Sequence, residues 1–166
     1  TFQPDESVVV EPVFYQMEVK NTLDDNLMLF YTKLKRDASE VLKTQNRAIS
    51  KKRKVLQKMR DLVHPLKDVL SGKNNVNVFG EILHKNWMLK KSITDQVSSA
   101  KIDVYYDKAI AAGAIGGKLL GAGGGGFLLF YVEKKNQNSV REVLSELYEL
   151  KFELDTDGTR ITYYDQ

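Results

Sequence analysis

The residue pattern that could do chemistry is a glycine-rich stretch in the C-terminal half of the chain. Eight of the 11 glycines lie between Gly113 and Gly126, and four are consecutive, from Gly123 to Gly126. Glycine tolerates positive φ and has no Cβ, so its N–H groups can approach an anion or another backbone closely. An apolar segment follows directly, which indicates a folded element rather than a linker. Composition alone leaves open both an anion-binding loop and a tight β-hairpin without a ligand.

Three known phosphate-binding patterns can be compared with this stretch. A P-loop requires Ser or Thr after its Gly-Lys pair, whereas Leu119 follows that pair here. Gly121, Gly123 and Gly126 satisfy G-x-G-x-x-G, but a strand-like segment follows where a dinucleotide-binding fold has a helix. The glycine loop of protein kinases does lie between strands, but this chain has neither H-R-D nor D-F-G. None of the three patterns fits.

Length and composition limit the remaining chemistry. The chain has 166 residues, which is about one domain. It has no cysteine, which excludes disulfides, thiolate zinc sites, iron–sulfur clusters and cysteine nucleophiles. The two histidines, His64 and His84, are too few for a histidine-rich metal site, and we expect no metal ligands in this chain. No apolar run reaches the length of a membrane span, so we expect no membrane partner.

Positive charge is concentrated in the middle of the chain. Residues 33–91 hold 16 Lys or Arg and 5 Asp or Glu, with the densest run at residues 51–54. Such a patch could contact phosphate, nucleic acid or an acidic protein. A solvated helix face is the simpler interpretation, because no RNA-binding aromatic motif accompanies it. A basic nucleic-acid-binding domain therefore stays as an alternative that we do not favour.

Hydrophobic periodicity divides the chain into strand-like and helix-like segments. The expected elements are, in chain order, strands over 8–14 and 27–32, helices over 38–45, 55–70, 76–93 and 101–112, strands over 117–121 and 126–132, and a helix from 139. Asp157-Gly158 predicts a closing hairpin between strand-like segments around 152–154 and 161–163. This order predicts an α+β fold, with helices packed on one face of a largely antiparallel sheet.

Cap and breaker residues set several of these boundaries. Ser98 or Ser99 can cap the helix over 101–112. Pro65 is expected to kink the second helix or to start a new helix there. Ser139 and Glu142 form a capping-box pattern, which predicts a helix start at Ser139.

One expected helix carries polar residues on its apolar face. Asn86 and Lys90 share the face of the apolar residues in the helix over 76–93. Polar groups in such a place need hydrogen-bond partners or a cleft. The simpler alternative is that they lie at the end of the stripe and reach water.

The glycine stretch and its flanking segments resemble a known family. The stretch from Gly113 to Gly126 resembles the third conserved motif of the GHMP kinases, which include galactokinase, homoserine kinase, mevalonate kinase and phosphomevalonate kinase. Residues 97–103 resemble the family's V-S-x-P-x-I-D helix start, with Ala100 in place of proline. Residues 29–42 and 87–92 are similar to the D-glycero-D-manno-heptose phosphate kinases and their fucokinase relatives, with Lys33 where glycine is expected.

The resemblance implies a C-terminal, ferredoxin-like domain of an ATP-dependent, cytoplasmic small-molecule kinase that uses Mg²⁺. It implies strands over 1–35 that link from a missing N-terminal domain, and the GHMP kinase C-terminal domain over 36–166. The family's P-x-x-x-G-L-G-S-S phosphate loop belongs to the N-terminal domain and is not in this chain. We therefore expect this chain alone to be inactive and to need the N-terminal half as partner. The implied substrate is a sugar or sugar phosphate, with heptose phosphate favoured.

The site residues follow from the same resemblance. No catalytic residue and no metal ligand is expected in this chain. The expected cofactor-binding residues, which would contact ATP or the acceptor through backbone N–H groups, are Gly121, Ala122, Gly123, Gly124, Gly125 and Gly126. Weaker candidates for an acceptor phosphate are Lys118, Arg36 and Lys90, on charge complementarity. A non-catalytic ligand-binding or regulatory domain of the same fold stays as an alternative, and the acceptor sugar and atom stay open.

Overall fold

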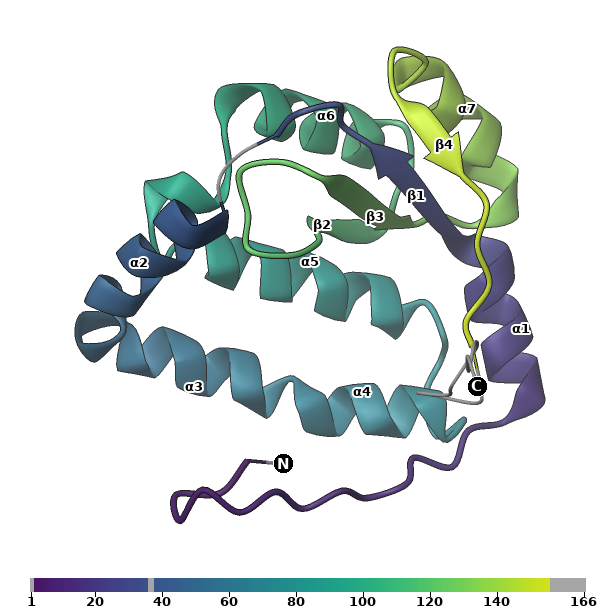
Figure 1. Ribbon diagram of the computed structural model, residues 1–166. Helices are drawn as coiled ribbons and strands as arrows, with labels where there is room; N and C mark the ends of the chain where they lie inside the picture. Colours follow the sequence, from purple (N-terminus) through teal and green to yellow (C-terminus); the bar gives the residue numbers. More distant parts are fainter. Residues whose placement is uncertain (1, 36–37, 156–166) are drawn as a thin grey trace, which may run out of the picture.

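The fold is a four-stranded antiparallel sheet with helices packed against it (Figure 1). The computed structural model describes residues 2–35 and 38–155. The strands are β1 (Leu27–Tyr31), β2 (Gly116–Leu119), β3 (Phe127–Tyr131) and β4 (Tyr148–Leu150). Their order in the sheet is β2-β3-β1-β4. This ferredoxin-like strand order confirms the predicted α+β fold class.

Along the described chain, one helix precedes β1, and the other helices lie between β1 and β2 and between β3 and β4. They are α1 (Met17–Asn26), α2 (Ala38–Ala48), α3 (Arg53–Asp61), α4 (Val63–Leu70), α5 (Val78–Lys91), α6 (Ala100–Ala111) and α7 (Gln137–Val143). Short 3-10 helices cover Ser50–Lys52, Asp95–Val97 and Lys134–Asn136. None of the helices in the described ranges is long and apolar enough to cross a membrane.

One face of the sheet carries the main hydrophobic core. Phe30 of β1 and Phe130 of β3 meet edge to face, with ring centroids 6.2 Å apart. Tyr106 of α6 lies 5.7 Å from the Phe130 ring, and Trp87 of α5 packs on Tyr106. These side chains are almost completely buried, together with residues from α7 such as Val140. The buried apolar area on this face is what holds α6 and α7 on the sheet.

The opposite face of the sheet is only partly covered. Leu27 and Tyr131 are buried there by Leu23 of α1, with Phe79 and Leu83 of α5 packed against them. Figure 1 shows α5 running below the sheet, with α3 and α4 on its outer side. Further along the strands, Leu29, Tyr31, Phe127 and Leu129 are half-buried. The end of this face that joins the glycine-rich loop therefore stays accessible.

The predicted helix boundaries in the middle of the chain are largely confirmed. The Ser99 side chain accepts a hydrogen bond from the Ile102 N–H at 3.4 Å, so Ser99 caps α6. The expected break near Pro65 is also present, because a new helix begins at Val63. Pro65 lies in the first turn of α4, where its missing N–H costs little.

The N-terminal segment differs from the prediction. The expected strand over 8–14 is wrong, because Val8 forms only an isolated bridge with Phe2 and residues 9–16 have no regular structure. Valine favours a strand only where a neighbouring strand can pair with it, and none lies beside this segment in the described chain. Residues 2–35 also contain α1, which was not predicted, and β1, which lies inside the sheet.

The C-terminal segment differs as well. The capping box at Ser139 is wrong, because α7 begins two residues earlier, at Gln137. The segment around 152–154, expected as a strand, has no regular structure, and β4 lies just before it. Asp157-Gly158 and the segment over 161–163 lie outside the described residues.

Candidate functional site

The glycine-rich loop covers residues 120–126 and joins β2 to β3. The Leu120 N–H donates to the Phe127 carbonyl at 2.8 Å, and the Thr32 N–H donates to the Gly126 carbonyl at 2.9 Å. The backbone angle φ is +79° at Gly121, +120° at Gly123, +78° at Gly124 and +103° at Gly126. Residues with a Cβ are strained at such angles, so this backbone path requires glycine.

Two neighbouring segments contact the loop at short range. The Gly124 N–H donates to the Val97 carbonyl at 3.0 Å, and a Cβ on Gly123 would lie 2.7 Å from the same oxygen. On the other side, the Gly126 N–H donates to the Leu34 carbonyl at 3.1 Å. A Cβ on Gly125 would collide with the Leu34 carbonyl. Close packing of the loop against other backbone, one of the two roles expected for these glycines, is therefore present in the structure.

The loop also leaves backbone donors without a protein partner. The N–H groups of Gly121, Ala122, Gly123 and Gly125 donate no hydrogen bond to another described residue. These residues line an open hollow of about 450 Å³, together with Tyr31, Leu34, Lys35, Leu120 and Gly126. Unpaired backbone N–H groups around a hollow are suited to binding anionic oxygen atoms.

Two of the three weaker candidates lie beside this loop. The Lys90 ammonium donates to the Gly121 carbonyl at 2.5 Å, and the Lys118 ammonium donates to Asn86 Oδ1 at 2.9 Å. Within the described ranges, no carboxylate lies at ion-pair distance from either lysine. The polar residues on the apolar face of α5 thus have partners, and they bring positive charge to the loop.

Both lysine ammonium groups are destabilised by their surroundings. Burial lowers the pKa of Lys90, and the nearby charge of Lys118 lowers it further. Burial alone lowers the pKa of Lys118. A bound anion would offset the cost of burying the two charged ammonium groups and would reduce their mutual repulsion. The pair is therefore suited to binding an anion.

The segment that follows β1 contains Lys33, which departs from the family pattern, and Arg36. Lys33 stands where glycine was expected, and its φ is +59°, a conformation that glycine adopts without strain. Its ammonium donates to the Glu146 carbonyl at 3.0 Å. Arg36, the third candidate for an acceptor phosphate, lies outside the described residues.

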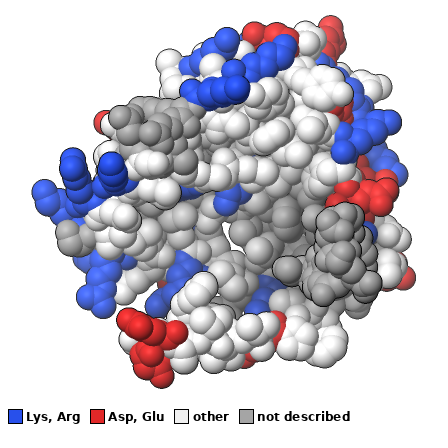
Figure 2. All heavy atoms as spheres, viewed as in Figure 1, with Lys and Arg blue, Asp and Glu red and all other residues white. Residues whose placement is uncertain are grey.

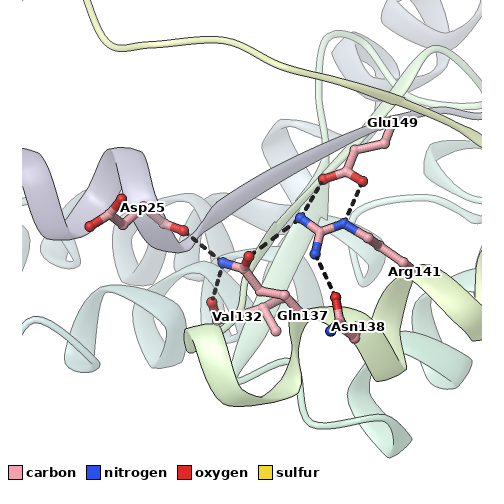
Figure 3. Close-up of polar contacts among 6 residues, drawn as sticks. All are labelled: Asp25, Val132, Gln137, Asn138, Arg141 and Glu149. Carbon is pink, nitrogen blue, oxygen red and sulfur yellow. Dashed lines mark hydrogen bonds and ion pairs between the residues drawn. The ribbon is translucent and has the colours of Figure 1, made fainter.

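A second hollow, of about 610 Å³, lies at the other end of β1, and its polar groups are bonded to one another. Figure 3 shows Arg141 beside it, with Nε and Nη2 donating to Glu149 at 2.8 and 3.1 Å. Glu149 thereby raises the pKa of Arg141. Gln137 Nε2 donates to the carbonyl oxygens of Asp25 and Val132 at 2.6 and 3.3 Å. These groups already have partners, so the hollow at the glycine-rich loop is the better candidate site.

The family implies Mg²⁺, and the described residues do not fit a metal ion. They contain no group of three or more His, Cys, Asp or Glu side chains that could hold one.

The basic run over residues 51–54 lies where a 3-10 helix joins α3. Figure 2 shows Lys and Arg gathered on the side formed by α2 and α3, and α3 has no buried residue. This placement agrees with a solvated helix face.

Sequence reasoning missed one residue at the loop. Gln45 of α2 donates through Nε2 to the Ala122 carbonyl at 2.8 Å. Gln45 is 77 positions from Ala122 in the sequence. The sequence around it carries only a helical pattern, so no local signal identifies it.

Comparisons with known proteins agree with this fold. A family model described as GHMP kinases C terminal matches residues 66–150. A curated D-glycero-alpha-D-manno-heptose 7-phosphate kinase from Campylobacter jejuni is 26% identical over 167 residues, covering 96% of this chain and 48% of that protein. The chain therefore spans about half the length of this curated relative.

Solved structures show the same architecture. The L. major mevalonate kinase complex with R-mevalonate has a TM-score of 0.66 at 17% identity, over 85% of this chain and 44% of that chain. A D-glycero-D-manno-heptose 1-phosphate kinase from Bacteroides thetaiotaomicron has a TM-score of 0.54 at 21% identity, over 92% of this chain and 40% of that chain. The family match spans half of this chain and includes Lys90, Lys118 and the whole glycine-rich loop. The chain belongs to the family of GHMP kinase C-terminal domains.

Proposed function

We propose that this chain is the C-terminal part of a cytoplasmic, ATP-dependent kinase whose acceptor is a sugar phosphate, with heptose phosphate as the favoured class. The observation that carries the proposal is the pair Lys90 and Lys118, which have no carboxylate partner among the described residues and lie beside the glycine-rich loop. Two ammonium groups beside the glycine-rich loop match a phosphate dianion, and they do so outside the hollow that the unpaired N–H groups line. The name of the relative from Campylobacter jejuni supports heptose 7-phosphate.

The residues of this chain then have distinct tasks. The unpaired N–H groups of the glycine-rich loop, those of Gly121, Ala122, Gly123 and Gly125, bind anionic oxygens of ATP or of the acceptor. The two lysines hold the acceptor's own phosphate. Phosphoryl transfer depends mainly on positioning the reactants and stabilising charge, which backbone donors and ammonium groups can supply. Mg²⁺ neutralises charge on the transferred phosphoryl group when it is bound. The described residues do not hold it, so we assign its ligands and the phosphate loop to an N-terminal half.

The acceptor class is tested by a kinase assay on the natural full-length protein. ATP consumption is measured with heptose 7-phosphate, heptose 1-phosphate, unphosphorylated heptose and mevalonate. We expect the highest kcat/KM for one of the two heptose phosphates, and no turnover by residues 1–166 alone. A preference for mevalonate or unphosphorylated heptose would refute the assignment.

The role of the lysine pair is tested by charge removal. Lys118→Met and Lys90→Met each remove a charged contact to phosphate, which corresponds to a roughly 10- to 100-fold loss of kcat/KM for the sugar phosphate. Lys85→Met is the matched control, because Lys85 is an exposed lysine of α5. It should stay within about twofold of wild type. An equal loss for an unphosphorylated acceptor would show that the pair does not recognise the acceptor's phosphate.

A further inference from the structure

Two side chains hold successive carbonyl groups at the start of the glycine-rich loop. The Lys90 ammonium donates to the Gly121 carbonyl, and Gln45 Nε2 donates to the Ala122 carbonyl at 2.8 Å. Gln45 comes from α2 and Lys90 from α5, so helices on two sides contribute. Gln45 is uncharged, and neither the sequence nor the proposed function gives it a task.

The geometry of the peptide bond connects this contact to the neighbouring donor. In a trans peptide, the carbonyl and the N–H of the next residue point in opposite directions. No cis peptide bond is present in the described chain. The Gly123 N–H therefore points away from the Gln45 side chain. Gln45 is not among the residues that line the hollow, whereas Ala122 and Gly123 are.

The Gly123 N–H is a donor that needs an explanation. Gly123 is buried, yet its N–H has no acceptor in the described part of the chain. The next N–H, of Gly124, does have one, because it donates to the Val97 carbonyl at 3.0 Å. Buried backbone donors are nearly always paired, so an unpaired donor at a hollow indicates a missing acceptor.

We propose that Gln45 is a positioning residue: by holding the Ala122 carbonyl, it directs the Gly123 N–H into the hollow, where this group donates to a phosphate oxygen of the ligand. The inference rests on the proposed function, since it takes the loop to be an anion-binding site. It adds a residue of α2 that contacts no ligand itself. Without the Gln45 contact, no hydrogen bond from a described residue fixes the Ala122 carbonyl, and the glycine that follows restricts the orientation of this peptide little.

The test uses inorganic phosphate and pyrophosphate as probes, titrated into the ¹⁵N-labelled protein. The amide signals of Ala122 and Gly123 are followed by NMR. Gln45→Met keeps the length of the side chain and removes its donor, and Gln45→Glu removes the donor while adding charge. Gln137→Met is the matched control, because it removes the same amide-to-carbonyl contact near the other end of β1 (Figure 3).

We expect the Gly123 signal of the wild type to shift saturably with pyrophosphate. Gln45→Met should weaken this binding about five- to tenfold, as for the loss of one well-placed hydrogen bond, and Gln137→Met should leave it within twofold. Signals outside the loop report whether each variant stays folded. If Gln45→Met is folded and both Gln45 variants bind like wild type, the positioning role is wrong while the anion site stands. If the wild-type signals do not respond, both the site and the positioning role are wrong.

Discussion

Replacing Gly123 by alanine tests whether the loop depends on close backbone packing. Gly121→Ala is the matched control, because both glycines have positive φ but a Cβ at Gly121 meets nothing within 4 Å. A left-handed conformation costs an alanine roughly 1–2 kcal/mol, and the stiffer unfolded chain offsets about 0.4–1 kcal/mol. Gly121→Ala should therefore lower the free energy of unfolding by about 0.5–1 kcal/mol.

Gly123→Ala should cost more, for two reasons that the structure gives. Its Cβ would lie 2.7 Å from the Val97 carbonyl oxygen, and that oxygen accepts the Gly124 N–H at 3.0 Å. Moving Val97 away breaks this hydrogen bond, which adds about 0.5–1.5 kcal/mol to the strain. The total loss should be about 1–2.5 kcal/mol, with Tm lowered by roughly 2–10 °C for a domain of this size.

Urea unfolding followed by circular dichroism measures both variants. The expected result is a lower urea midpoint for Gly123→Ala than for Gly121→Ala, with the same m-value. Equal midpoints would refute the reasoning, because they would show that Val97 does not restrict the loop. A changed m-value for Gly123→Ala would show that the substitution alters the compactness of the folded or the unfolded state.

Four further predictions test other parts of the structure. Because the charge of Lys118 lowers the pKa of Lys90, Lys118→Met should raise the pKa of Lys90 toward its ordinary value of 10.5, measured by NMR on ¹³C-methylated lysines. In the wild type, the free energy of unfolding should rise as pH increases from the lowered pKa toward 10.5, since the unfolded state then binds more protons, and Lys90→Met should flatten this rise. Lys33→Gly should be about 1 kcal/mol more stable than Lys33→Ala in urea, because φ at this position is +59°. Gly116→Ala should lower Tm by roughly 5 °C or more, because its Cβ would collide with the Gly80 carbonyl of α5.

Local signals in the sequence predicted much of the fold. The glycines of the loop adopt the positive φ that their side-chain-free backbone permits, and Ser99 caps α6 as its position suggested. Asn86 and Lys90 stood out as polar residues on an apolar face, and both have partners: Lys118 of β2 for Asn86 and the Gly121 carbonyl of the loop for Lys90. These features depend on neighbours within a few residues or on one helix face, which is why a sequence can reveal them.

The features that were missed depend on distant parts of the chain. The residues around Val8 have strand propensity, but in the described ranges residues 9–16 have no regular structure. Helix α1 has few apolar residues, and its buried Val19 and Leu23 matter only because β1 and β3 lie beside them. Helix α7 begins at Gln137, whose side chain donates to the carbonyls of Val132 and of Asp25, which is 112 positions away in the sequence.

The acceptor-phosphate site is tested most directly by the pKa values of Lys90 and Lys118 with substrate bound. They are measured by NMR on the ¹³C-methylated full-length protein, without and with saturating heptose 7-phosphate. A bound phosphate favours the charged form of a nearby lysine, so the pKa of both lysines, lowered in the free protein, should rise on binding. Saturable binding of heptose 7-phosphate that leaves both pKa values unchanged would contradict the account.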